Sequence, residues 1–222
     1  NLKVSLRANF NMEVKLISIT QPLIEGLSCA EDIIVHNARV SNPNNQLNLD
    51  TGDKLLNYCI KNGHWSVFEQ VDATFEIKTS RAIAAQILRH RSFSFQEFSQ
   101  RYAEVTDFEP VELRLQGKTN RQVGEEEYID PDLAEKIKQH TSNCYTLYRN
   151  LVDKGVAKES ARFVLPLNTQ SCLYMKGSCR SWIHYFDVRC TNHTQKEHRD
   201  IANGIKEIFK TQFPIVSKAL NY

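Results

Sequence analysis

The chain has 222 residues, of which 41% are hydrophobic and 24% charged, with only 8 glycines and 6 prolines. This composition is typical of a folded protein and excludes a disordered or fibrous chain. Twenty-eight basic and 26 acidic side chains give a formal net charge of +2, which excludes a whole-molecule field for nucleic acid or an anionic membrane. Any anion-binding site must therefore be local.

The length favours one domain around one core. Residues 1–11 precede an internal Met12 and show little pattern, so we expect them to be a leader outside the fold and residues 12–222 to form the domain. The six cysteines include no C-x-x-C pair, and free thiols are expected. The longest apolar runs are too short for a membrane helix, and no signal-peptide pattern is present. These features predict a soluble, cytoplasmic protein.

Two elements are predicted near the start of the domain. Apolar and polar residues alternate over 14–20, which predicts a strand ending before Pro22. Ser28 and Glu31 have the spacing of a capping box, so a helix of about ten residues should follow them.

A second strand and helix are predicted in the middle of the chain. Residues 71–79 alternate with period two, which indicates a half-buried strand. Thr79 or Ser80 can cap a helix over 81–90.

The second half of the chain is predicted to be mainly helical. Residues 110–130 show no persistent period, so we expect a surface excursion of low order. Pro131 starts a long helix that ends at Gly155, and helices are also predicted over 179–190 and 193–213. The expected apolar face of the long helix consists of Leu133, Ile137, Cys144, Leu147 and Leu151. Together the elements predict an α+β fold in which helices pack on a β-sheet.

The stretch RHRSFSFQEFSQRY, residues 89–102, has the chemistry of a nucleotide pocket. Its phenylalanines lack helical spacing, so the segment from Phe93 should be extended. Its three arginines offer bidentate forks to phosphate, and Glu97 can accept from an imide or a ribose hydroxyl. Gln86 lies one turn before Arg89 and extends the same polar face. The alternative is a solvated surface of paired charges above inward-facing phenylalanines.

A second polar cluster lies near residue 180. Arg180 and His184 are one helical turn apart. His193 and Glu197 have a spacing that suits zinc, but this signal lacks the further ligands that a zinc site requires. Arg162 lies in the apolar run ARFVLPLN and needs a partner if it is buried.

Nucleic-acid binding is the rival interpretation of the arginine cluster, because arginine and aromatic side chains can stack on bases. The near-neutral charge and the absence of an RRM, KH or helix-turn-helix signature argue against it. A glycine-rich phosphate loop is also missing from the sequence, so side chains would have to hold any nucleotide.

The sequence resembles the flavin-dependent thymidylate synthases, the ThyX family. The signature is RHR followed by seven residues and a serine, here Arg89, His90, Arg91 and Ser99. The resemblance extends from about Lys15 to the C-terminus. It includes QILRHR (86–91), QEFSQRY (96–102), GHWSVFE (63–69), ARFVLPLN (161–168) and RSWIHYFDVR (180–189).

The resemblance implies reductive methylation of dUMP to dTMP. Methylenetetrahydrofolate would supply the one-carbon unit, and a bound FAD, reduced by NADPH, would supply the hydride. It also implies a homotetramer of α+β subunits whose active sites lie where subunits meet. No metal is implied.

The resemblance further implies a set of dUMP-binding residues. These are Gln86, Arg89, Glu97, Ser99, Gln100, Arg101, Arg162 and Arg189. Arg189 and Ser99 are the candidate catalytic residues, with Arg189 placed against the uracil imide, where a guanidinium stabilises negative charge. Ser99 has only Glu97 nearby as a base, so we expect no enzyme nucleophile.

The implied flavin site contains His64, Ser66, Arg89, His90, Arg91, Glu97, Ser178, Arg180 and His184. Three positions depart from the family pattern. Ser178 and Cys179 stand where the family often has Asn and Ala, and Gln100 stands where glycine is common. These departures affect local hydrogen bonds to the flavin more than the reaction.

Overall fold

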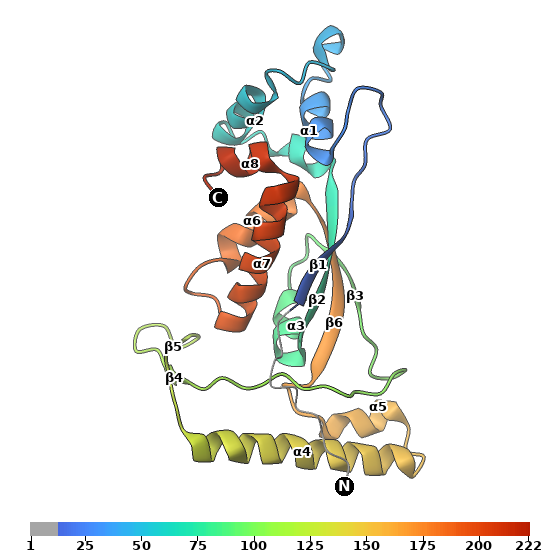
Figure 1. The fold of residues 1–222 in the computed structure, drawn as a ribbon, viewed down its shortest axis with the longest axis vertical. Coiled ribbons are helices and arrows are strands. Elements are labelled where there is room, and N and C mark those ends of the chain that lie inside the picture. Colours follow the sequence, from blue (N-terminus) through green and yellow to red (C-terminus); the bar gives the residue numbers. More distant parts are fainter. Residues whose placement is uncertain (1–12) are drawn as a thin grey trace.

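The computed structural model describes residues 13–222, so the expected leader at 1–11 lies outside the described residues. A four-stranded antiparallel sheet has the order β1 (Glu13–Ile19), β2 (Asp72–Ser80), β6 (Gln170–Ser178), β3 (Ser94–Glu97). Helices α3 (Arg81–Ile87), α6 (Cys179–Arg189) and α7 (Lys196–Gln212) lie on one side of it (Figure 1). This arrangement confirms the predicted α+β fold.

Shorter elements surround this core. Helices α1 (Ala30–Ala38) and α2 (Gly52–Lys61) and the 3-10 helices η1 (Pro43–Asn45) and η2 (Trp65–Glu69) precede β2. Helices α4 (Pro131–Asp153) and α5 (Lys158–Ala161) and the 3-10 helix η3 (Arg162–Val164) lie beyond the far end of the sheet, and α8 (Pro214–Ala219) follows α7 (Figure 1). Among residues 13–222, no helix combines the length and apolar character needed to cross a bilayer.

The two central strands build the core through their inner faces. Phe75 and Ile77 of β2 lie opposite Met175 and Leu173 of β6, and all four side chains are buried. Trp182 of α6 packs edge-on against Phe75, with ring centroids 4.9 Å apart. The period-two pattern of β2 is confirmed because this strand has one face buried against the helices and one face partly exposed to solvent.

Strand β6 was missed by the sequence analysis. Its inward positions are Ser171, Leu173, Met175 and Gly177, so only half of them are large and apolar. Serine and glycine fill positions where other parts of the chain come close, and this hides the alternation on which strand prediction depends.

The helix predicted after Ser28 is confirmed, but its predicted cap is wrong. Asp32, rather than Glu31, accepts hydrogen bonds from the backbone N–H groups of Ser28 (2.8 Å) and Cys29 (3.1 Å). Glu31 is 2% exposed and accepts from two backbone N–H groups at the start of α8, at 2.7 and 3.1 Å. Glu31, which local spacing assigns to the cap of α1, therefore makes a long-range contact with α8 instead.

The predicted surface excursion at 110–130 contains a hairpin, which corrects the expectation of low order. Strands β4 (Arg114–Gln116) and β5 (Gly124–Glu127) pair antiparallel. Arg114 forms an ion pair with Glu197 at the start of α7. This contact spans more than eighty residues of sequence, so no local period could reveal it.

The long helix α4 is confirmed, with Asp130 as its cap and Gly155 just beyond its end at φ +82°. Its predicted buried face is only partly covered within the single chain. Leu133 and Leu147 are 40% and 49% exposed, whereas Ile137, Cys144 and Leu151 are half-buried. Thr141 and Tyr148, which are helical neighbours of these three, are buried, so the covered face is shifted from the predicted one.

Candidate active site

The signature segment is attached to the sheet by Phe93. Its ring packs edge-on against Trp182, with centroids 4.7 Å apart, and lies over Gly177 of β6. A Cβ atom at position 177 would approach the Phe93 ring to 2.4 Å, so only glycine fits beneath it. The phenylalanine therefore holds the polar residues around it at a defined place on the sheet.

Glu97 lies at the end of β3 and is already bonded within the chain. It forms an ion pair with Arg81 and accepts a 2.7 Å hydrogen bond from the Ser171 hydroxyl. Neither Arg81 nor Ser171 was predicted as a site residue. Arg81 is the first residue of the helix predicted over 81–90, but only the pairing of β6 with both β2 and β3 brings it to Glu97.

Arg189 and His90 are brought together although 99 positions separate them. The Arg189 Nε–H group donates to His90 Nε2 at 2.9 Å. Burial, followed by the Arg189 and His184 charges, lowers the pKa of His90 to about 4. The neutral imidazole thus accepts from Arg189 and orients its guanidinium, and within residues 13–222 neither terminal NH₂ group has a partner, so both can bind a ligand.

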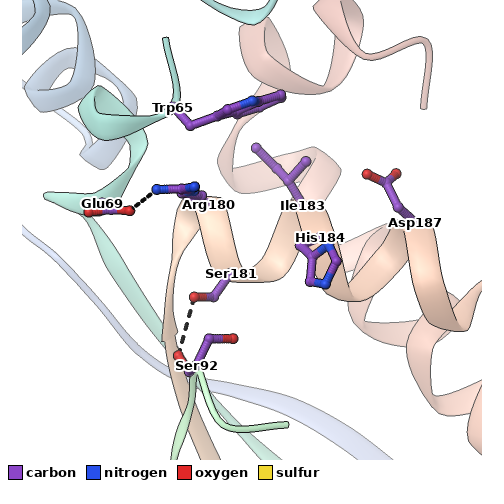
Figure 2. A pocket seen from close by; sticks show the side chains of 8 residues that line it. All are labelled: Trp65, Glu69, Ser92, Arg180, Ser181, Ile183, His184 and Asp187. Atoms are coloured by element: carbon purple, nitrogen blue, oxygen red, sulfur yellow. Dashed lines mark hydrogen bonds and ion pairs between the residues drawn. The ribbon is translucent and has the colours of Figure 1, made fainter. Parts of the chain in front are cut away.

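A cleft of about 500 Å³ lies between η2 and α6 (Figure 2). Trp65 forms one wall, while His184 and Asp187 project from α6 on the other side. Arg180 also lines the cleft and pairs with Glu69. The predicted pair Arg180 and His184 therefore shares one cavity.

A second hollow of about 560 Å³ adjoins this cleft, since Trp65 and Arg180 line both. It contains His64 and Ser66. The His64 ring is exposed and lies edge-on to Tyr58, with centroids 5.6 Å apart. Four predicted flavin residues therefore surround one continuous depression.

Ser178 has a different environment from these four residues. Its hydroxyl accepts a 3.2 Å hydrogen bond from the Ser181 backbone and caps α6. The Ser181 hydroxyl in turn donates to the Ser92 carbonyl at 3.2 Å (Figure 2). Ser178 thus fixes the start of the helix that carries Arg180.

Arg89 and Arg91 are exposed, and within residues 13–222 neither guanidinium has an ion-pair partner. A solvated surface of mutually paired charges would have matched them with carboxylates. The two positive charges are therefore available to an anionic ligand.

The remaining predicted nucleotide residues lie elsewhere. Ser99 and Arg101 line a hollow of about 420 Å³ beside α5, and Arg101 pairs with Glu159 at 3.1 Å. Gln100 is 7% exposed, and its amide nitrogen has no hydrogen-bond partner among the described residues. The Arg162 guanidinium lies 6.0 Å from the Phe163 ring, without an ion pair in the described part of the chain. The predicted dUMP-binding residues therefore lie in two regions, one beside α5 and one around Gln86 and Arg189.

The weak zinc signal at His193 and Glu197 has no support from the geometry. Glu197 is ion-paired with Arg114, and His193 is exposed. Within residues 13–222, no three histidine, cysteine or carboxylate groups gather as metal ligands would.

The fold and the side chains define a single-domain α+β protein with unpaired arginines suited to a phosphorylated ligand. Residues 22–215 match the family model described as "Thymidylate synthase complementing protein" (Thy1). The chain therefore belongs to the flavin-dependent thymidylate synthase family, which confirms the resemblance.

Relatives of this family match nearly the whole chain. A "Probable flavin-dependent thymidylate synthase" of Paramecium bursaria Chlorella virus 1 is 49% identical over 215 residues, covering 95% of this chain and 100% of the relative. A "Flavin-dependent thymidylate synthase" of Synechocystis sp. is 50% identical over 218 residues with the same coverage. The crystal structure of the UMP/dUMP methylase PolB from Streptomyces cacaoi, bound with 5-Br dUMP, has the same fold. Its TM-score is 0.78 at 22% identity, over 95% of each chain.

Proposed function

We propose that the chain is a flavin-dependent thymidylate synthase that methylates dUMP to dTMP. The observation that carries the proposal is the identity of about half its residues with relatives of that name over their full length. The unpaired arginines of the signature supply the positive charge that a nucleotide phosphate requires. The comparisons give no support to the alternative of an RNA-binding module.

The depression around Trp65 fits a flavin. It has an aromatic wall, two histidines and a guanidinium, while Arg89 and Arg91 are free to bind the phosphates of FAD. His64, Ser66, Arg180 and His184 would hold the cofactor directly, whereas His90, Glu97 and Ser178 would hold neighbouring groups in position. FAD, when bound and reduced by NADPH, supplies the hydride.

The uracil ring of dUMP is assigned to Arg189. When carbon 5 of the ring acts as a nucleophile towards the one-carbon unit of methylenetetrahydrofolate, negative charge develops on the pyrimidine, and a guanidinium at the imide edge stabilises it. The neutral His90 fixes this guanidinium. Gln86 lies in the same region.

The phosphate and sugar of dUMP are assigned to the second group of residues. Arg101, Arg162 and the Ser99 hydroxyl would bind the phosphate. The Gln100 amide nitrogen, which has no hydrogen-bond partner among the described residues, would donate to the nucleotide. Ser99 is not expected to attack the ring, because Glu97, the only candidate base in its segment, is held by Arg81 and Ser171.

A homotetramer would unite the two groups of residues. Two observations support sites shared between subunits. The two groups are separate within one chain, and Leu133 and Leu147 of α4 are exposed, as are Phe163 and Leu167 at 83% and 73%.

The function is tested by assaying dTMP formation from dUMP and methylenetetrahydrofolate, with FAD or NADPH omitted in turn. We expect the protein to purify yellow, to release FAD on denaturation and to need every component. Product formation that depends on neither FAD nor NADPH would exclude the flavin mechanism. A colourless protein that cannot be loaded with FAD but binds RNA with a steep salt dependence would instead support the RNA-binding alternative.

A further inference from the structure

A buried polar chain links helices α3, α6 and α7. His198, in the first turn of α7, is fully buried, as is Tyr185 of α6. His198 Nε2 lies 3.0 Å from the Tyr185 hydroxyl, and His198 Nδ1 lies 3.4 Å from Gln86 Oε1. The Gln86 amide nitrogen donates to Gln195 Oε1 at 2.7 Å.

With the Gln86 amide oriented as in the structure, the donors and acceptors of this chain have one consistent arrangement. Gln86 Oε1 can only accept, so His198 must carry its proton on Nδ1. His198 Nε2 then accepts from the Tyr185 hydroxyl, which burial keeps protonated by raising the pKa of Tyr185. Burial, with the Arg189 and His90 charges, lowers the pKa of His198 to about 3, so the ring remains neutral.

This arrangement of donors and acceptors fixes the orientation of the Gln86 amide. Its carbonyl is turned towards His198 and one N–H towards Gln195, and the second N–H has no partner among the described residues. Without the Nδ1 donor, the amide could rotate by 180° and present an acceptor instead.

We propose that His198 is a positioning residue for the substrate: through its Nδ1–H group it sets the orientation of the Gln86 amide, so that Gln86 donates to dUMP. The inference rests on the proposed function. His198 itself touches no substrate, since Gln86 and Tyr185 lie on its two nitrogens and its side chain is enclosed.

Three substitutions separate this role from simple packing. His198→Leu removes both ring nitrogens, His198→Asn retains an amide donor near the Nδ1 position, and His198→Gln places its amide near the Nε2 position. We expect His198→Leu and His198→Gln to raise the KM for dUMP about tenfold while changing kcat and FAD content less than twofold. His198→Asn should recover most of the dUMP affinity.

A double-mutant cycle with Gln86→Ala supplies the decisive readout. If His198 acts through Gln86, then His198→Leu should weaken dUMP binding no further in a Gln86→Ala chain. Equal losses in both backgrounds, or a folded His198→Leu protein with the wild-type KM for dUMP, would overturn the inference. His36→Leu, which changes a histidine in α1, is the matched control and should behave as wild type.

If His198→Leu does not fold, Tyr185→Phe keeps the buried ring and removes only the hydroxyl that anchors His198. It should raise the KM for dUMP several-fold in the wild-type background and not in Gln86→Ala; an unchanged KM would count against the inference. A wild-type protein that neither binds nor methylates dUMP would refute the proposed function instead. Normal wild-type activity with a loss on Gln86→Ala, but none on the folded His198 variants, would refute this inference alone.

Discussion

Two histidines near Arg189, the buried His198 and the half-buried His90, remain uncharged in the folded protein. The pKa of His90 is lowered to about 4 and that of His198 to about 3, in both cases mainly by burial. Protonation of either would place a second positive charge beside Arg189. The residues that orient Arg189 and Gln86 are therefore neutral at physiological pH, which keeps Arg189 as the cation offered to the ligand.

The same shifts predict how stability depends on pH. The unfolded chain binds protons at these histidines below pH 6.5, whereas the folded chain does so only near pH 4 and pH 3, so the stabilisation is complete above pH 6.5 and is lost as the pH falls. For His198, the free energy of unfolding should drop by about 1.5 kcal/mol between pH 6.5 and 5.

Urea unfolding of wild type and His198→Leu between pH 5 and 7.5 measures this contribution. We expect a shallower pH dependence in the variant. His193→Leu, which removes an exposed histidine, should retain the wild-type dependence. Identical slopes for wild type and His198→Leu would contradict the prediction.

Strand β6 connects the core to the site at the level of secondary structure. It pairs with β2 on one side and β3 on the other, and α6, with Arg180 and Arg189, follows it directly. Gly177 allows Phe93 to cross the strand, and this contact fixes the signature segment relative to α6.

Gly177→Ala should therefore disturb both stability and the site. The new Cβ would overlap the Phe93 ring, and overpacking of this kind costs about 1–3 kcal/mol. We expect a lower urea midpoint and reduced FAD occupancy, because Arg91 and Ser92 adjoin the displaced ring.

The double variant Gly177→Ala/Phe93→Leu should regain part of this loss, because a smaller side chain relieves the overlap. Gly204→Ala in α7 is the control. Among residues 13–222 its Cβ would meet a single side-chain atom, a Val14 methyl group at 3.0 Å, and alanine favours the helix, so it should stay within about 1 kcal/mol of wild type. Full stability of Gly177→Ala would show that Phe93 does not need this position.

The arrangement of the whole molecule leaves the proposed nucleotide residues in two separate regions. Gln86 and Arg189 lie among α3, α6 and α7, and Ser99 and Arg101 lie beside α5. Leu147 of α4 and the nearby Phe163 and Leu167, which follow α5, are exposed, and α4 packs against α5. Association of identical chains would cover the apolar face and bring complementary regions together.

Shared sites can be tested by mixing inactive variants. Arg101→Ala and Arg189→Ala should each abolish most dTMP formation. When the two are unfolded together and refolded, mixed oligomers should regain a measurable fraction of activity, because some sites receive both native arginines. Light scattering should report a tetramer for each variant. A tetramer without any restored activity would mean that one chain supplies both arginines to a site.

Local pattern alone was sufficient for β1, β2, α4 and α7, because their periods and end signals arise from neighbouring residues. The signature motif likewise indicated the family. Strand β6, the β4–β5 hairpin and the cap of α1 were missed or assigned wrongly. Each depends on a partner far away in the sequence, such as Phe93 for Gly177, Glu197 for Arg114 and α8 for Glu31.

The sequence by itself determined the family, the proposed reaction and most of the arginines assigned to it, since these depend on residue type and short spacing. Only the tertiary structure decided which of those residues are free and which are held. It pairs Glu97 with Arg81 and joins His90 to Arg189, and His198 to Gln86, by hydrogen bonds. Within residues 13–222 it leaves Arg89 and Arg91 without ion-pair partners. The physical reason is that burial and hydrogen-bond direction arise from contacts between distant segments, and these contacts set the charge and orientation of each group.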